Sequence, residues 1–165
     1  MTEHSAREAT GAAAGAGSVL VGIDGSDGSR AALDHAFDEA HWRGLPLVAV
    51  TAFEPPDLWV TAEGLVPPFA QLEHAARQLA QNVIDAVVSA RVTLGAPVPE
   101  VHLLVRSGPA SAVLETLSTH AKLLVVGHRG RGALTSRLLG SVGLSTVLHA
   151  ACTVTVVRAP EPPAT

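Results

Sequence analysis

Between positions 127 and 142 the chain places glycines, arginines and a serine directly after a short apolar run. Glycine has no Cβ, so backbone N–H groups in such a stretch can close on an oxyanion and adopt positive φ angles. Gly140 and Ser141 stand where a helix is expected to begin, and the free N–H groups of a helix start attract anions. This spacing predicts phosphate binding. The candidate contacts are Gly127, Arg129, Gly130, Arg131, Gly132, Gly140 and Ser141.

Such a loop could hold a triphosphate with useful affinity. A helix start contributes roughly 0.3–1 kcal/mol toward holding a negative group, and each charged hydrogen bond contributes on the order of 1.5–3 kcal/mol. About four or five contacts would therefore support micromolar binding, about 8 kcal/mol. The alternative is a structural loop in which glycine only eases packing. Clustered glycines, a serine at a helix start and nearby arginines together favour binding.

Other phosphate-binding and catalytic motifs are missing from the sequence. There is no G-x-x-x-x-G-K-[ST], and no G-x-G-x-x-G follows the first predicted strand, so a P-loop is excluded and a dinucleotide dehydrogenase is disfavoured. Ser141 has no evident Asp and His support and G-x-S-x-G is absent, so we assign no catalytic residue. Asp34 and Asp38 are expected on a solvated helix face. His149 and Cys152 lack further ligands nearby, so we expect no metal site.

The apolar pattern predicts the elements that position these residues. Apolar runs without alternation are typical of strands buried on both faces and predict strands at 18–23, 45–53 and 123–127. Further strands are expected at 98–105 and 154–157. Helices should begin after Ser26 or Asp27, end at Gly44, and cover 69–94, the segment after Pro109, and 142–150. The stripe that the long helix is expected to bury comprises Leu72, Ala76, Leu79, Val83, Ala86 and Val87.

Strands that alternate with helices predict an open parallel sheet with helices on both faces. Such sheets bind ligands at the C-terminal ends of their strands, near the point where strand order reverses. Asp24 and Gly127 both stand at strand ends, so we expect them to face one ligand. The alternative for Asp24 is a turn residue that caps the first helix.

Composition narrows the class of function. The 165 residues, 47% hydrophobic and 16% charged, fit a single domain. A net charge of −4 gives no long-range attraction to nucleic acid or to an anionic membrane, and no apolar run approaches the roughly 18 residues of a membrane span. The single cysteine, Cys152, favours a reducing compartment, and residues 1–17 lack the apolar region of a secretory signal, so we predict a cytoplasmic protein with flexible tails at 1–17 and 159–165.

The glycine spacing also carries a resemblance to a known family. Gly127, Gly130, Gly140 and Ser141 fit G-x2-G-x9-G-[ST], and residues 21–26 fit V-G-x-D-G-S. Over roughly 18–158 the chain resembles the ATP-binding universal stress proteins. The resemblance implies a Rossmann-like fold of the adenine nucleotide alpha hydrolase type, with a five-stranded parallel sheet of order 3-2-1-4-5. It also implies ATP, with or without Mg²⁺, as the ligand, and a homodimer formed through the last strand.

The resemblance assigns roles by position. Asp24 would face the ribose or the adenine, Gly22 would line the same floor, and Ala52 would meet the adenine through its backbone. The groups that would surround the ribose and phosphates, through backbone atoms and one hydroxyl, belong to Gly127, Gly130, Gly140, Ser141 and Val142.

The sequence departs from the family pattern away from the phosphate ligands. Thr51-Ala52 replaces a frequent His-Val, and Lys122 replaces a usual acidic residue. Ala151 and Thr153 flank Cys152 where prolines are common, and Gly143 weakens the helix after Ser141. We therefore expect the adenine pocket and the dimer edge to differ from the family norm.

Three functions remain open from the sequence. The first is a regulatory module that binds ATP, with at most slow hydrolysis or autophosphorylation. The second is an enzyme that uses ATP for adenylyl or phosphoryl transfer, and the third is an interaction protein whose loop binds no nucleotide. The complete glycine set argues against the third.

Overall fold

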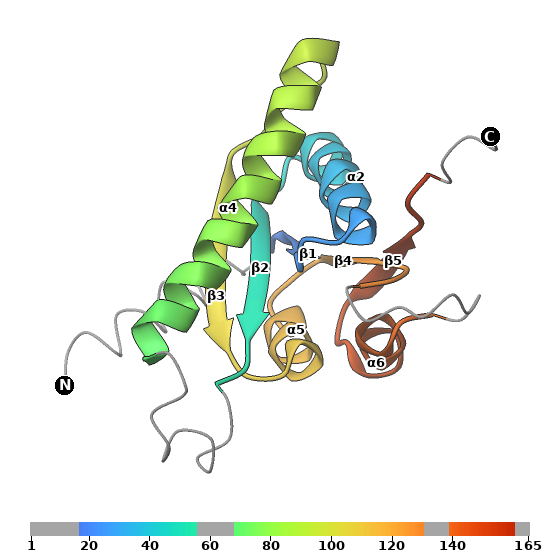
Figure 1. Cartoon of the computed structure of the whole chain (residues 1–165). Helices are drawn as coiled ribbons and strands as arrows, with labels where there is room; N and C mark the ends of the chain where they lie inside the picture. The colour runs from blue at the N-terminus through green and yellow to red at the C-terminus, as the bar shows by residue number, and fades with distance from the viewer. Residues whose placement is uncertain (1–16, 56–67, 131–138, 161–165) are drawn as a thin grey trace, which may run out of the picture.

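The computed structural model describes residues 17–55, 68–130 and 139–160 of the chain. In this part strands and helices alternate along the sequence (Figure 1). The strands are β1 (Val19–Gly22), β2 (Leu47–Phe53), β3 (Val101–Ser107), β4 (Leu123–Gly127) and β5 (Thr153–Val157). The helices are α2 (Asp27–Arg43), α4 (Phe69–Leu94), α5 (Ala110–Ser118) and α6 (Ser141–His149).

The five strands form one parallel sheet in the order β3-β2-β1-β4-β5. Val19 of β1 pairs with Leu47 of β2 on one side and with Leu123 of β4 on the other. The predicted fold class and strand order are confirmed. Because the chain moves outward from β1 to β3 and then crosses back to β4, strand order reverses between β1 and β4, where ligands of such sheets bind.

The central strands are buried on both faces and therefore serve two cores. Alternate residues of a strand point to opposite faces. Val19 and Val21 of β1 belong to the core under α2 and α4, whereas Leu20 belongs to the core under α5 and α6. The same alternation runs through β2 and β4. This explains the unbroken apolar runs in the sequence.

The ends of α2 follow the predicted caps. The hydroxyl of Ser26 accepts a hydrogen bond from the N–H of Ser29 at 3.1 Å, and Gly44 ends the helix in the left-handed region with φ of 62°. At such a φ a side chain would be strained, which explains glycine there.

Two details of the predicted elements are wrong. The buried face of α4 comprises Ala80, Val83, Ile84, Val87 and Arg91, whereas Ala86 is exposed because it lies about 100° around the helix from Val87. The third strand begins at Val101 rather than at Val98. Residues 97 and 99 are prolines without a ladder donor, so pairing cannot start earlier without losing hydrogen bonds.

A buried arginine joins α4 to α2. The Arg91 guanidinium donates hydrogen bonds to Oδ1 of Asp34 at 2.6 Å, to Oδ1 of Asp38 and to the carbonyl of Pro97, and it lies 5.3 Å from the centre of the Phe37 ring. Burial lowers the pKa of Arg91, but hydrogen bonds and charge from Asp38 and Asp34 raise it overall. The prediction that Asp34 and Asp38 lie on a merely solvated face is therefore wrong, because both carboxylates hold the guanidinium.

Candidate functional site

A pocket of about 340 Å³ lies at the C-terminal edge of the sheet, beside the ends of the paired strands β1 and β4. It is lined by every predicted site residue that the structure describes: Gly22, Asp24, Ala52, Gly127, Arg129, Gly130, Gly140, Ser141 and Val142. Arg131 and Gly132 lie outside the described residues. The fold thus gathers segments that are far apart in the sequence at the point where strand order reverses.

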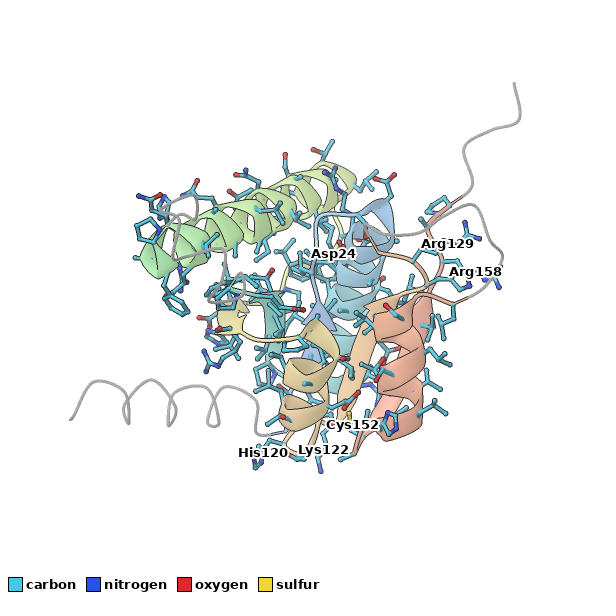
Figure 2. All side chains as sticks on the ribbon, turned by 60° about the horizontal axis from the view of Figure 1, so that its bottom comes forward. Asp24, His120, Lys122, Arg129, Cys152 and Arg158 are labelled. Carbon is cyan, nitrogen blue, oxygen red and sulfur yellow. The ribbon has the colours of Figure 1, made fainter. Side chains whose placement is uncertain are left out.

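The turn after β1 holds Asp24 in place (Figure 2). Oδ1 of Asp24 accepts one hydrogen bond from the Ser26 N–H at 2.9 Å and another from the Ser26 hydroxyl at 2.6 Å. The same hydroxyl accepts from the Ser29 N–H, so Ser26 rather than Asp24 caps α2. Oδ2 of Asp24 faces Gly130, because a Cβ built on that glycine would lie 2.5 Å from it. The carboxylate is therefore oriented by the turn and lies against the loop after β4.

Two glycines let the start of α2 touch the loop after β4. A Cβ on Gly127 would come within 2.5 Å of the Gly28 backbone, and a Cβ on Gly28 would overlap the carbonyl oxygen of Arg129. Real Cβ atoms do not approach other atoms so closely, so a side chain at either position would force the backbones apart. These glycines are required by packing of the protein itself.

Gly140 has a different environment. A Cβ there would meet its nearest atom, the carbonyl oxygen of His128, at 3.6 Å, and its φ of −62° suits any residue. Its N–H donates to that same carbonyl at 3.0 Å. The protein itself therefore already uses this donor, and the predicted place of Gly140 beside a ligand stays a prediction.

The amides that follow Gly140 can serve the predicted role. No side chain caps α6, and Gly140 accepts its first intrahelical hydrogen bond from Leu144. The N–H groups of Ser141, Val142 and Gly143 are those that an α-helix leaves without an internal acceptor. They line the pocket, where the helix dipole favours negative charge.

The apolar walls of the pocket were not predicted. Ile23 and Val126 come from the ends of β1 and β4, Val50 comes from the middle of β2, and Ala110 and Leu114 come from α5. The strand-end positions could have indicated Ile23 and Val126. The sequence carries no local signal for Ala110 and Leu114, because they reach the pocket only through packing of α5 on the sheet.

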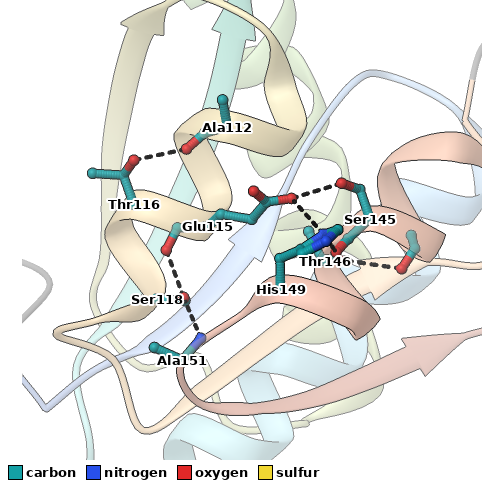
Figure 3. Close-up of polar contacts among 9 residues, drawn as sticks. Ala112, Glu115, Thr116, Ser118, Ser145, Thr146, His149 and Ala151 are labelled. Atoms are coloured by element: carbon teal, nitrogen blue, oxygen red, sulfur yellow. Dashed lines mark hydrogen bonds and ion pairs between the residues drawn. The ribbon is translucent and has the colours of Figure 1, made fainter.

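One hydrogen bond joins α5 to α6, and another joins the end of α5 to the residues between α6 and β5 (Figure 3). The Ser145 hydroxyl donates to Oε1 of Glu115 at 2.7 Å, and Nδ1 of His149 lies 3.8 Å from the same oxygen. The Ser118 hydroxyl accepts from the Ala151 N–H at 2.8 Å. Since both helices line the pocket, these contacts fix the distance between two of its walls.

Two titratable groups, His128 and Cys152, have shifted pKa values; Figure 2 labels Cys152 at one end of the sheet and Arg129 and Arg158, which act on His128, at the other. Beyond β4, partial burial and the positive charges of Arg158 and Arg129 lower the pKa of His128. Before β5, burial raises the pKa of the Cys152 thiol, whose Sγ lies 3.4 Å from the carbonyl of Thr153. The histidine ring is therefore mainly neutral at pH 7, and the thiol is protonated.

Few ionisable residues of the described chain line the pocket. In the part of the chain that the structure describes, Asp24 and Arg129 are the ionisable residues of its lining. Within those ranges, no three His, Cys, Asp or Glu side chains come together as a metal site would require. Among the described helices, none has the length and apolar character needed to cross a bilayer.

Residues 16–158 match the model of the universal stress protein family. This span extends from just before β1 to the residue after β5. The chain belongs to the universal stress protein family.

Relatives agree with this assignment. A universal stress protein of Mycobacterium tuberculosis is 40% identical over 133 residues, which are 81% of this chain but only 42% of the relative. One from Thermus aquaticus is 35% identical over 85% of this chain and 97% of its own length. A universal stress protein solved in complex with cAMP is 26% identical, covers 87% of this chain and 98% of its own, and superposes with a TM-score of 0.62. The chain spans less than half the length of the mycobacterial relative.

Two departures from the universal stress protein pattern have a physical explanation. A Cβ on Gly143 would lie 2.9 Å from the end of the Leu139 side chain, so glycine leaves that side chain its place although it lowers helix propensity. Ala151 donates its N–H to Ser118, a bond that proline could not make. Nothing in the structure explains Lys122.

Proposed function

We propose that this universal stress protein binds an adenine nucleotide, ATP with or without Mg²⁺, and acts as a regulatory module with at most slow hydrolysis or autophosphorylation. The observation that carries the proposal is the single pocket in which Asp24, the loop after β4 and the start of α6 meet. Its volume of about 340 Å³ falls within the range of small-molecule sites.

The two sides of the pocket suit the two parts of a nucleotide. Val50, Ala52 and Leu114 offer apolar surface to an adenine ring. Asp24, oriented by Ser26, can accept hydrogen bonds from ribose hydroxyls. The amides of Ser141 to Gly143 and the Arg129 guanidinium can hold phosphate oxygens.

The presence of glycine at position 140 is a further argument that a ligand lies here. Packing explains Gly28 and Gly127, but nothing in the described protein excludes a Cβ at Gly140. Its absence leaves room in the pocket at the position where the phosphates would lie. The relative in complex with cAMP, an adenine ring with ribose and one phosphate, supports the same class of ligand.

The described lining favours binding over fast catalysis. Its one carboxylate, Asp24, already accepts two hydrogen bonds from Ser26, and no histidine or lysine of the described lining stands beside it as a base. We therefore infer a nucleotide-dependent change of conformation, homodimer or partner binding rather than a dedicated reaction. The homodimer would form through β5, which is one of the two edge strands of the sheet in the described chain.

The test is nucleotide analysis of the denatured purified protein, followed by calorimetric titration with AMP, ATP and ATP with Mg²⁺. Asp24→Asn keeps an acceptor for Ser26 but removes the charge, and we expect about tenfold weaker binding. Asp85→Asn, on the exposed face of α4, is the matched control and should bind normally. Gly140→Ala should keep its melting temperature and lose affinity.

Other outcomes would contradict the proposal. Fast turnover with a defined co-substrate would indicate a transfer enzyme. Absence of binding by the unaltered chain would indicate an interaction protein, and equal binding by Asp24→Asn and Asp85→Asn would remove Asp24 from the site.

A further inference from the structure

A second hollow, of about 570 Å³, adjoins the nucleotide pocket. Its walls are the turn and first residues of α2 (25–28), the loop 128–130, and residues 158–160 after β5. Arg129 and Gly130 line both hollows, but Gly140 to Gly143 line only the first. We call the second hollow the Arg158 groove.

The register of the sheet places the positive residues of the groove side by side. Gly127 pairs with Val157, and the His128 N–H donates to the Val157 carbonyl at 2.6 Å. His128 directly follows the last residue of β4, and Arg158 directly follows the last residue of β5. The two residues therefore lie next to each other at the same end of the sheet. Figure 2 shows Arg158 near Arg129 beyond the ends of the strands.

The lining of the groove holds more basic than acidic side chains. Arg129, Arg158 and His128 face it from two segments, and Asp27 at the start of α2 contributes the acidic side chain of its lining. The two arginines, together with partial burial, disfavour protonation of His128. Positive groups so close to one another repel, and a multiply charged anion between them would relieve that repulsion.

We propose that the Arg158 groove binds a phosphate-type oxyanion, with Arg158 and His128 as ligands that the nucleotide pocket does not use. Guanidinium groups bind phosphate through paired N–H groups, and a protonated imidazole adds a further donor. The oxyanion is either the distal phosphates of a nucleotide whose adenosine occupies the first pocket or a separate inorganic phosphate chain. The first source rests on the proposed function, and the second does not.

The test uses the full chain and inorganic pyrophosphate. Binding is measured by calorimetry, and the His128 ring is followed by NMR as a function of pH. We expect pyrophosphate to raise the pKa of His128, because a nearby anion favours the imidazolium. Arg158→Gln should weaken pyrophosphate binding about tenfold, and Asp27→Asn should strengthen it roughly threefold because it removes a repelling charge.

Lys122→Gln is the matched control. It removes one positive charge, as Arg158→Gln does, but Lys122 precedes β4 and lies at the other end of the sheet from Arg158 (Figure 2). A five-residue strand is about 17 Å long, beyond the ~8–10 Å screening length of ordinary buffers. Its pyrophosphate affinity should stay within about twofold of the unaltered chain.

Measuring the affinities for AMP and for ATP distinguishes the two sources of the oxyanion, the nucleotide and a separate phosphate chain. If Arg158→Gln weakens ATP but not AMP, the groove holds the distal phosphates. If it weakens pyrophosphate and leaves ATP unchanged, the groove holds a separate anion. A pyrophosphate titration that leaves His128 unshifted, or equal affinities of Arg158→Gln and Lys122→Gln, would overturn the proposal while AMP binding still supports the nucleotide pocket. If the chain binds no nucleotide but binds pyrophosphate in a way that depends on Arg158, only the proposed function is refuted and the groove proposal stands.

Discussion

The two faces of the sheet are stabilised in different ways. Under α2 and α4 many side chains are fully buried, Phe37 among them, and Arg91 joins the two helices. Under α5 and α6 fewer side chains are fully buried, and partners such as Val142 and Val156 are only partly covered. There, hydrogen bonds from Ser145 to Glu115 and from Ala151 to Ser118 connect the elements.

Because of this difference, one face contributes mainly to the stability of the fold and the other contributes to the lining of the pocket. We call the side of the sheet under α2 and α4 the thick face and the side under α5 and α6 the thin face. The thick face supplies most of the completely buried apolar surface, which is the main source of stability. The thin face supplies Leu114 and the start of α6, which line the pocket. Substitutions on the thick face should therefore change the free energy of unfolding, whereas substitutions on the thin face should also change nucleotide affinity.

The largest effect is expected for Phe37→Ala. The ring is fully buried and packs under the Arg91 guanidinium, so its loss should lower the free energy of unfolding by about 3–5 kcal/mol. Urea denaturation measures this, and AMP affinity should be unchanged below the transition. The comparison between the faces would be wrong if Phe37→Ala altered affinity as strongly as stability.

A smaller effect is expected for Ser118→Ala on the thin face. The hydroxyl is buried and accepts from the Ala151 N–H, so its removal leaves that donor unpaired, at a cost of about 1–2 kcal/mol. AMP affinity should fall roughly threefold as α5 and α6 separate more easily. Thr116→Val, on the exposed side of α5, is the control and should leave affinity unchanged. Unaltered affinity in Ser118→Ala would show that the contact between α5 and α6 does not shape the pocket.

The smallest effect concerns Cys152, which packs against the thin face. Burial raises its pKa above 9.0, so less thiolate is present at pH 8 than in the unfolded chain, and alkylation should be slower than in urea. The rate should rise as the pH passes the raised pKa. Because the unfolded thiol ionises first, stability should fall slightly as the pH rises above about 9. Ser118→Ala should accelerate alkylation at pH 8, and an unchanged rate would contradict a loosened thin face.

Local patterns allowed much of the fold to be predicted. The apolar runs of β1, β2 and β4 and the bounds of α4 needed only neighbouring residues, and the strand order followed from the family resemblance. The start of β3 was missed because two prolines interrupt an otherwise alternating pattern. Ala86 was misplaced because it lies about 100° around the helix from Val87. Arg91 was missed because a stripe drawn from apolar residues alone leaves out an arginine that partners on another helix keep buried.

The site residues that belong to the glycine motif could be predicted from the sequence. The residues that reach the site only through tertiary packing could not. Gly127, Gly140 and Ser141 were found from their spacing, and the pocket gathers them. That the Gly140 amide already bonds to His128, and that Leu114 forms a wall, depend on contacts between distant segments. The spacing of residues in the sequence does not predict such contacts.

The backbone contact of Gly28 with the segment 127–129 determines which parts of the pocket can adapt. Main chain rests on main chain there, with no side chain between that could rotate to make room. This wall lies against α2, whose inner face is fully buried, so it should keep the same outline whichever ligand the pocket takes. Any widening of the pocket would have to come from the opposite side, where α6 packs on side chains that are only partly buried.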